Sequence, residues 1–197
     1  MSSNPTRLQR MLSIAHAPLD SDALACIEGN ASAAVKSFAV GWLNAYHDPA
    51  PRCFAGASTS RTVVKRVEVE REREGTGKVL TLVSEVEATE ELLDRRDAVA
   101  QAFIIAILDE CLSAAVTALD FHEGGLGITT ATLGLDTAFH NPVPLGSTLR
   151  FICTTTAAST DPGLQSGRCE VWDVSLRRLV ATAVLSGMRS SLPKPKL

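Results

Sequence analysis

The chain has 197 residues, of which 45% are apolar and 21% are charged, and it contains 13 glycines and 9 prolines. These values are ordinary for one globular domain, or for a domain with an extension, and they exclude collagenous, low-complexity and globally disordered chains. The 19 basic and 22 acidic side chains give a net charge of −3. The protein therefore has no basic field for nonspecific binding of nucleic acid or of an anionic membrane surface.

The cysteines and the amino-terminal sequence bear on the cellular compartment. The five cysteines are odd in number, lack the spacing of a metal site and lie mostly in apolar runs. We therefore expect buried, reduced thiols and no bound metal. The start of the chain has no apolar run long enough for a secretory signal, so a cytoplasmic protein is expected. The helical spacing of apolar residues between Leu8 and Ala15 weakly resembles a mitochondrial presequence, which makes the mitochondrion the alternative.

Residues 1–60 predict a helical extension followed by a linker. One helix is expected to start at Asn4-Pro5, and a second is expected over Ala31 to Tyr46. The stretch from Asp48 to Ser60 is rich in Pro, Gly, Ser and Ala, which is typical of a linker. We expect the two helices to pack outside the core of a domain that spans residues 61–197.

From Arg61 onward the sequence alternates between apolar and polar residues, as half-buried strands do. The pattern predicts six strands, and Glu74-Gly75-Thr76-Gly77 marks the turn between the first two. The predicted strands are Thr62–Arg71, Lys78–Glu87, Leu126–Phe139, Ser147–Ala158, Gly167–Ser175 and Leu179–Arg189. Because most of their connections are short, these strands must pair in the antiparallel sense.

The segment Ala98 to Leu119 is the most apolar part of the chain. It is rich in Ala and Leu, lacks Gly and Pro, and predicts a helix of 22 residues that is buried on every side. A membrane span would place Asp109 and Glu110 near the bilayer centre, at a cost of about 2.5 to 3.5 kcal/mol each. We therefore expect no membrane span, and instead an α+β fold in which an antiparallel sheet wraps around this helix.

The two carboxylates in the middle of this helix are the clearest candidates for a functional site. Burial of an ionised carboxylate costs several kcal/mol unless it is hydrogen-bonded or faces a water-filled cleft. Asp109 and Glu110 point about 100° apart, so one can face a cleft while the other reaches a rim or a subunit boundary. Ser113 follows Asp109 by one turn and can supply a hydroxyl on the same face. The alternative is a subunit interface in which backbone amides or an arginine satisfy both acids.

Three short segments and the order of elements over about residues 78–188 carry a family resemblance. The first segment has Ala100-Gln101-Ala102 and then Ile107-Leu108-Asp109-Glu110, the second runs from Ala138 to Gly146, and the third from Gly167 to Ala183. Together they resemble the hotdog-fold acyl-CoA thioesterases, especially the PaaI-like group. In that family the first segment has a His-Gly-Gly motif and an apolar run that ends in Asp, the second is an aromatic strand followed by Pro and Gly, and the third forms the closing strands.

This resemblance implies a hotdog dimer or tetramer with a site between protomers that hydrolyses an acyl-CoA thioester to the free acid and coenzyme A. Asp109 would act as general base or nucleophile, and the backbone N–H of Gln101 or Ala102 would bind the thioester oxygen. Asp94 stands where the family usually has an amide that holds the attacking water. Thr132 stands near the hydroxyl that often completes the site from the neighbouring subunit.

The resemblance also identifies candidates for contacts with the substrate, and it implies no cofactor apart from the coenzyme A of the substrate. These candidates are Asn141, Pro142, Gly146 and Arg168. Of the two central acids, only Asp109 is expected to control chemistry, whereas Glu110 is expected to affect stability or assembly.

The chain departs from the family at two positions, and these departures keep other functions open. The His-Gly-Gly motif is absent, and Asp94 adds a negative charge that would raise a carboxyl pKa or repel the substrate. The first alternative is a noncatalytic hotdog protein that binds acyl groups or serves as a scaffold. The second is a hotdog dehydratase or hydratase, which is disfavoured because the predicted helix contains no histidine.

Overall fold

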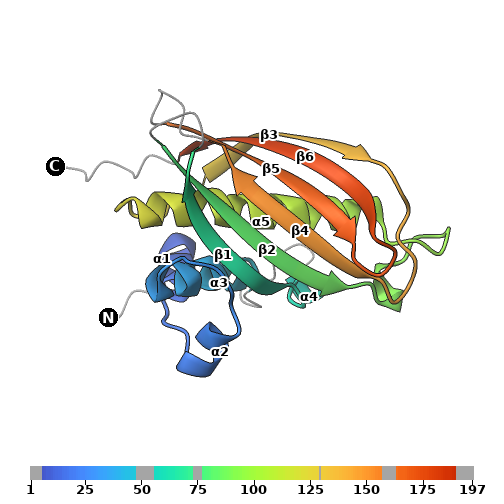
Figure 1. Ribbon diagram of the computed structural model, residues 1–197, viewed down its shortest axis with the longest axis horizontal. Helices are drawn as coiled ribbons and strands as arrows, with labels where there is room; N and C mark the ends of the chain where they lie inside the picture. Colours follow the sequence, from blue (N-terminus) through green and yellow to red (C-terminus); the bar gives the residue numbers. More distant parts are fainter. Residues whose placement is uncertain (1–5, 48–55, 73–76, 129, 157–162, 190–197) are drawn as a thin grey trace.

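The computed structural model describes residues 6–47, 56–72, 77–128, 130–156 and 163–189. Within these ranges six strands form one antiparallel sheet in the order β1-β2-β4-β5-β6-β3, which curves around the long helix α5 (Figure 1). The strands are β1 (Val63–Arg71), β2 (Lys78–Glu87), β3 (Thr130–Phe139), β4 (Thr148–Thr155), β5 (Leu164–Asp173) and β6 (Arg178–Arg189). The predicted architecture of an antiparallel sheet wrapped around a long helix is confirmed.

The strand boundaries differ from the predicted ones mainly at the start of β3. The strand begins at Thr130 and not at Leu126, because the chain turns at Gly127, whose φ is +58°. A side chain at Gly127 would collide with the ring of Phe38, so glycine is required there on both steric and conformational grounds. The predicted end of the fourth strand, near Ala158, lies outside the described residues.

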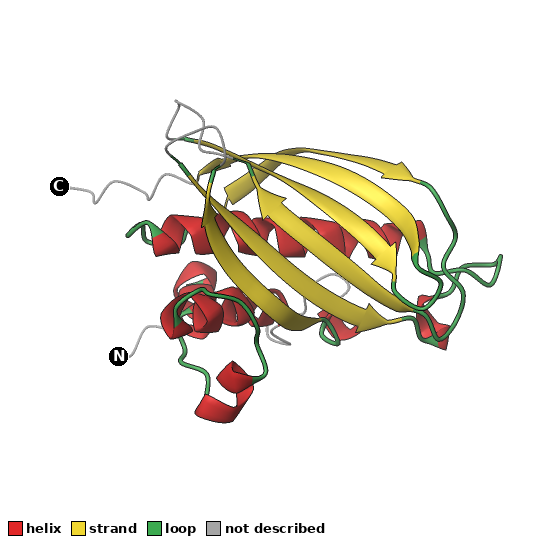
Figure 2. Cartoon of the chain, viewed as in Figure 1, coloured by secondary structure: helices red, strands yellow, loops and turns green. Residues whose placement is uncertain are grey.

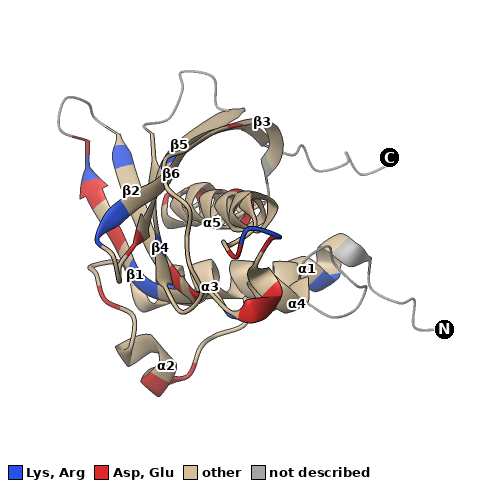
Figure 3. Ribbon diagram, turned by 90° about the vertical axis from the view of Figure 1, so that its right-hand side faces the viewer, with Lys and Arg blue, Asp and Glu red and all other residues tan. Residues whose placement is uncertain are grey.

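Helix α5 (Gln101–His122) runs through the centre of the molecule. Figure 3 shows it end-on, with the sheet curved around it and the amino-terminal helices packed beneath. Its fully buried residues include Ile107, Leu108 and Leu112, which lie in one core with Leu82 of β2 and Phe151 of β4. By length and composition α5 could cross a membrane, but most of it is buried inside the molecule, as expected for a core helix.

The amino-terminal segment forms four helices in the described ranges, two more than expected (Figure 2). They are α1 (Arg7–Ala15), α2 (Ser21–Ala25), α3 (Ala33–His47) and α4 (Gly56–Thr59). Residues 48–55 of the predicted linker lie outside the described residues. The division of the chain at residue 60 remains a prediction.

Helix α3 is part of the core and does not pack outside it. Phe38, Trp42 and Leu43 are at most 2% exposed and belong to the same apolar cluster as Ile107 and Leu108 of α5. The sheet covers only part of the surface of α5, and α3 covers another. The sequence showed that α3 has an apolar stripe, but it did not show that the stripe faces α5.

The two edges of the sheet differ in whether another segment of the chain pairs with them. Residues just before α3 pair with β1: the Glu28 N–H donates to the carbonyl of Lys65 over 2.9 Å, and the Val67 N–H donates to the carbonyl of Glu28 over 3.0 Å. The Asn30 side chain then accepts from the Val69 N–H over 2.8 Å and donates to the Val69 carbonyl over 3.0 Å. Among the described residues no strand pairs with the outer side of β3, whose Leu133 is 59% exposed.

The predicted burial of the cysteines is confirmed at three positions and wrong at one. Cys111, Cys153 and Cys169 are buried and free of disulfide bonds, whereas Cys26, just after α2, is exposed. Burial raises the pKa of the Cys153 thiol well above its ordinary value, so this group is an unreactive part of the core. Cys53 lies outside the described residues.

Candidate functional site

Asp109 lies on a face of α5 that remains partly open. Gln101, Ile105 and Asp109 are spaced by four residues and share this face. Ile105 is 40% exposed, and Asp109 is partly exposed. Thr132 of β3 pairs with the buried Gly187, so its side chain points inward to α5. Its hydroxyl donates a hydrogen bond to Oδ1 of Asp109 over 2.8 Å.

A β-bulge explains how an exposed edge strand places its hydroxyl over the helix. The pairing register between β3 and β6 shifts between Thr132 and Gly134. Leu133 is the extra residue, and its side chain is left exposed. Bulges of this kind locally redirect the side chains of a strand. The register shift keeps Thr132 on the inner face together with Leu135, which is opposite the buried Leu185.

The amino-terminal end of α5 offers unpaired backbone donors. Ala100 is the N-cap and supplies no side-chain hydrogen bond. In the part of the chain that the structure describes, the N–H groups of Gln101 and Ala102 meet no acceptor, as is usual for the first turn of a helix. These groups and the positive end of the helix dipole suit a developing oxyanion. Gln101 precedes Asp109 by eight residues, which is about 12 Å along the helix axis, so the two do not meet within one chain.

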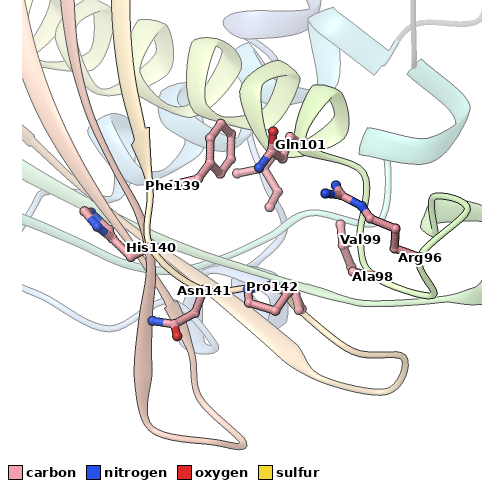
Figure 4. A pocket seen from close by; sticks show the side chains of 10 residues that line it. Arg96, Ala98, Val99, Gln101, Phe139, His140, Asn141 and Pro142 are labelled. Atoms are coloured by element: carbon pink, nitrogen blue, oxygen red, sulfur yellow. The ribbon is translucent and has the colours of Figure 1, made fainter.

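A cavity of about 420 Å³ opens beside this end of the helix (Figure 4). Its floor is apolar, since Val99, Ile104 and Val143 are at most 4% exposed. The side chains of Phe139, Gln101 and Arg96 all line it. The residues that line it are Arg96, Ala98, Val99, Gln101, Ile104, Phe139, His140, Asn141, Pro142 and Val143.

Asp94 lies in the loop before α5 and is paired with Arg96. The Arg96 side chain donates to Oδ2 of Asp94 through Nη2 over 2.7 Å and through Nε over 3.1 Å, and the Arg96 N–H donates to Oδ1 over 2.8 Å. These contacts hold the pKa of Asp94 below its ordinary value. The negative charge of Asp94 therefore has a positive partner in Arg96. Its effect on a second carboxylate or on a substrate remains a prediction.

The predicted substrate contacts separate into two groups. Asn141 and Pro142 line the cavity, although the Asn141 amide points away from Gln101 and donates to the Leu179 carbonyl over 2.7 Å. The structure does not bring Gly146 and Arg168 to this cavity. Gly146 lies in an exposed turn with φ +77°, and Arg168 is exposed on the face of β5 that points away from α5. A role in substrate binding remains a prediction for all four.

Ser113 shares the helical face of Asp109 but is only 2% exposed. Its carbonyl accepts a hydrogen bond from the Thr117 hydroxyl over 2.6 Å. The Ser113 side chain is therefore buried, whereas Asp109 is partly exposed to solvent. The catalytic role of Ser113 remains a prediction.

Glu110 points away from the open face of Asp109, toward the amino-terminal helices. Its Oε2 lies 3.2 Å from Nε2 of His47 at the end of α3, and its Oε1 accepts a hydrogen bond from the Thr59 hydroxyl of α4 over 3.3 Å. Neither partner was identified from the sequence, since both lie more than 50 positions from Glu110. The two acids are thus satisfied by side chains of different elements. Within the described ranges, neither acid is bonded to the backbone amides or to the arginine of the interface alternative.

No protein-family model matches the sequence, and the search of curated proteins finds no match. Solved structures do resemble it. Thioesterase superfamily member 2 from zebra fish aligns with a TM-score of 0.59 at 10% identity, over 77% of this chain and 97% of that chain. The mouse protein of the same name aligns with a TM-score of 0.52 at 9% identity, over 67% and 84%. A Streptococcus mutans protein bound to acetyl CoA aligns at 0.49 and 14% identity, over 65% and 91%. The chain therefore has the hotdog fold of the zebra fish and mouse proteins.

Proposed function

We propose that the protein hydrolyses an acyl-CoA thioester to the free acid and coenzyme A, with Asp109 as the catalytic carboxylate. The observation that carries this proposal is the local environment of the Asp109 side chain. It is a partly exposed acid in the middle of an apolar helix, and one hydroxyl orients it. Among the described residues no Lys, Arg or His lies within 4.0 Å of it. A carboxylate that no cation pairs with has an oxygen free to accept a proton from water.

In the general-base route, Asp109 removes a proton from water while the water oxygen bonds to the thioester carbon. The carbonyl oxygen becomes an oxyanion that the N–H groups of Gln101 and Ala102 stabilise. When the tetrahedral intermediate collapses, the C–S bond breaks and the thiolate of coenzyme A takes the proton from Asp109. The hydrogen bond from Thr132 fixes the orientation of the carboxylate, which leaves Oδ2 available to the water. In the nucleophilic route, Oδ2 itself attacks the thioester carbon, and the C–S bond breaks to release the thiolate of coenzyme A. Water then hydrolyses the resulting mixed anhydride, which releases the free acid and restores the Asp109 carboxylate.

Two protomers are needed to bring these groups together. The amides at Gln101 lie about 12 Å from Asp109 along one helix. A two-fold axis that runs across α5 places Gln101 of the partner subunit beside Asp109, and it forms two equivalent sites. The open outer side of β3 supports such pairing, because an unpaired strand edge readily accepts another strand. The acyl group would then lie in the apolar cavity beside Gln101.

The test is a set of acetyl-, hexanoyl-, phenylacetyl- and palmitoyl-CoA substrates, with free thiol as the readout. We expect hydrolysis of at least one substrate, and we expect Asp109→Asn to lower kcat about 100-fold or more, because it removes the base while it keeps the shape. Asp136→Asn is the matched control, since Asp136 is an exposed acid on the other face of β3. If Asp109→Asn turns over as fast as the unchanged protein, Asp109 is not the base. Binding of acyl-CoA without turnover would instead identify an acyl-binding protein.

A further inference from the structure

Two cavities lie on the face of the sheet that points away from α5. One, of about 610 Å³, opens over β1, β2 and β4, and the other, of about 370 Å³, opens over β4, β5 and the turn after β5. Arg150 and Ile152 of β4 line both cavities, so the two adjoin, and together they form what we call the outer groove. Phe151, between these two residues, faces the opposite way and is buried in the core with α5. The sheet therefore separates the outer groove from Asp109.

Two β-bulges shape the ends of the outer groove. At one end the register between β1 and β2 shifts between Val64 and Arg66, so the consecutive residues Lys65 and Arg66 are both exposed and both line the groove. In a regular strand, neighbouring side chains point to opposite faces. At the other end the register between β5 and β6 shifts at Trp172, which lines the groove together with Val174. Bulges are frequent next to active sites because they redirect side chains.

Positive charge exceeds negative charge in the outer groove, although the whole chain has a net charge of −3. The cations are Lys65, Arg66, Arg150 and Arg177. The acids are Glu28, Glu85 and Asp173. Two of these acids are already hydrogen-bonded. Glu85 accepts from Nε of Arg150 over 2.8 Å, and the fully buried Asp173 accepts from the Ser147 hydroxyl over 3.1 Å.

The cations at the β1 end are held only loosely. Nζ of Lys65 lies 4.0 Å from Oε2 of Glu85, and Nε of Arg66 lies 3.7 Å from Oε2 of Glu28. Both distances exceed that of a hydrogen bond, so these N–H groups remain available to the oxygen atoms of a ligand. At the other end, Arg177 is in no ion pair among the described residues. The groove therefore suits an anion.

The β5 end of the outer groove supplies an apolar surface. Trp172, Ile152 and Val174 are partly exposed and line it. The indole N–H of Trp172 donates to Oε2 of Glu170 over 3.0 Å, which fixes the orientation of the ring. In the sheet order β1-β2-β4-β5, three strand spacings separate Trp172 from Lys65, or about 14 Å. The groove thus joins an aromatic ring to a pair of cations over the length of a nucleotide.

We infer that the outer groove binds a nucleoside di- or triphosphate, with the base on Trp172 and the phosphates between Arg150 and the Lys65–Arg66 pair. Every nucleobase has a flat face that stacks on an aromatic ring. Lysine and arginine form strong, charge-assisted hydrogen bonds with phosphate oxygens. The adenosine phosphate of coenzyme A has the same chemistry, so a free nucleotide and that part of a coenzyme are the two sources that the test separates. This binding does not depend on the reaction proposed for Asp109.

The ends of the outer groove favour a small ligand over an extended acidic peptide. Cys26 and Glu28 line the end at β1, and the main chain of Glu28 is hydrogen-bonded to β1, so this wall is fixed. Arg177 lines the other end, in a turn where its φ is +52°. A peptide longer than the groove would have to cross one of these walls.

The first test is quenching of tryptophan fluorescence in the full-length protein by ATP, ADP, adenosine and inorganic triphosphate. The chain has two tryptophans, and Trp42 is fully buried, so a stacked base is detected through Trp172. We expect saturable quenching by ATP and ADP, and weaker binding of adenosine. Lys65→Gln should weaken ATP binding about tenfold, since it removes a charged donor to phosphate. Arg71→Gln is the matched control and should leave ATP binding unchanged, because Arg71 is an exposed cation of β1 outside the groove.

A second readout does not depend on fluorescence. Cys26 is exposed and lines the outer groove, so a bound nucleotide should slow its alkylation by iodoacetamide. Mass spectrometry of the peptide that contains Cys26 measures this reaction. Protection of Cys26 should need about tenfold more ATP in Trp172→Leu, which loses the stacking surface. If Trp172→Leu does not fold, the comparison of Lys65→Gln with Arg71→Gln decides the question.

Three results overturn the inference. In the first, no nucleotide quenches Trp172 or protects Cys26. In the second, inorganic triphosphate protects Cys26 as well as ATP does, which identifies a site for polyanions alone. In the third, polyglutamate protects Cys26 and ATP does not, which identifies a site for an acidic peptide. Coenzyme A separates the two sources: protection by ATP assigns the groove to free nucleotides, protection by coenzyme A alone assigns it to the nucleotide part of a coenzyme, and both support the inference.

Discussion

Thr132 and Asp109 lie 23 positions apart in the chain, and a hydrogen bond of 2.8 Å joins them. The bond connects the edge strand of the sheet to the middle of the buried helix. Because Thr132 follows the turn at Gly127 and sits at a β-bulge, two local features of the chain combine to set the orientation of one carboxylate. The predictions below begin with this contact.

Replacement of Thr132 by valine keeps the size of the side chain and removes the donor. We expect Thr132→Val to lower kcat about tenfold, since a hydrogen bond to a charged group is worth about 1.5 to 3 kcal/mol and only part of it concerns the transition state. Thr132→Ser keeps the hydroxyl and should recover most of the activity. Steady-state kinetics of the two variants on one acyl-CoA provide the measurement. Equal rates in both variants would show that Asp109 does not need this donor.

The assembly of the chain can be measured directly. Light scattering at micromolar protein concentration should give at least twice the mass of one chain, which is 20.9 kDa. Leu133→Lys places a charge on the open edge at a side chain that is 59% exposed, and it should shift the protein to the single-chain mass. A mass near 20.9 kDa for the unchanged protein contradicts the shared site.

Removal of residues 1–60 should destabilise the whole protein. The deletion removes Phe38, Trp42 and Leu43, which pack in the core with α5. Burial of each such side chain contributes about 1.5 to 3 kcal/mol to the free energy of unfolding. The sum is comparable to the net stability of a domain, which is about 5 to 15 kcal/mol. We expect insoluble protein or the loss of a cooperative unfolding transition in circular dichroism. A milder test is Trp42→Ala, with an expected cost of about 3 to 5 kcal/mol in urea unfolding. A truncated protein that unfolds cooperatively would restore the idea of an external extension.

The Asp94–Arg96 pair should make stability depend on pH in a defined direction. The pKa of Asp94 is lowered by its hydrogen bonds to Arg96, so its contribution is present above the ordinary value of 3.8 and is lost as the pH falls through the lowered pKa. Asp94→Asn should therefore lower the melting temperature at neutral pH, and the difference should shrink as the pH falls below 3.8. Arg96→Gln should show the same loss, and the two changes should not add. A difference that is constant across this range would contradict the pairing.

The sequence predicted the sheet and the central helix because each pattern is local. Alternation along Lys78–Glu87 and an apolar run over Ala98 to Leu119 depend only on neighbouring residues. The partners of these elements depend on tertiary packing, so the docking of α3 on α5 was missed. The same reason applies to the site. The carboxylates at Asp109 and Glu110 were anomalous in sequence, whereas His47 and Thr59 have no local feature that links them to Glu110.

The pairing of residues 28–31 with β1 limits how large an assembly built through sheet edges can become. The main chain at Glu28 and the Asn30 amide occupy the donors and acceptors of β1 that another molecule would need. Among the described residues, this leaves β3 as the sheet edge without a partner. If two molecules paired through this edge, both edges would be occupied, and growth through the sheet would end at a closed pair and not at a fibre.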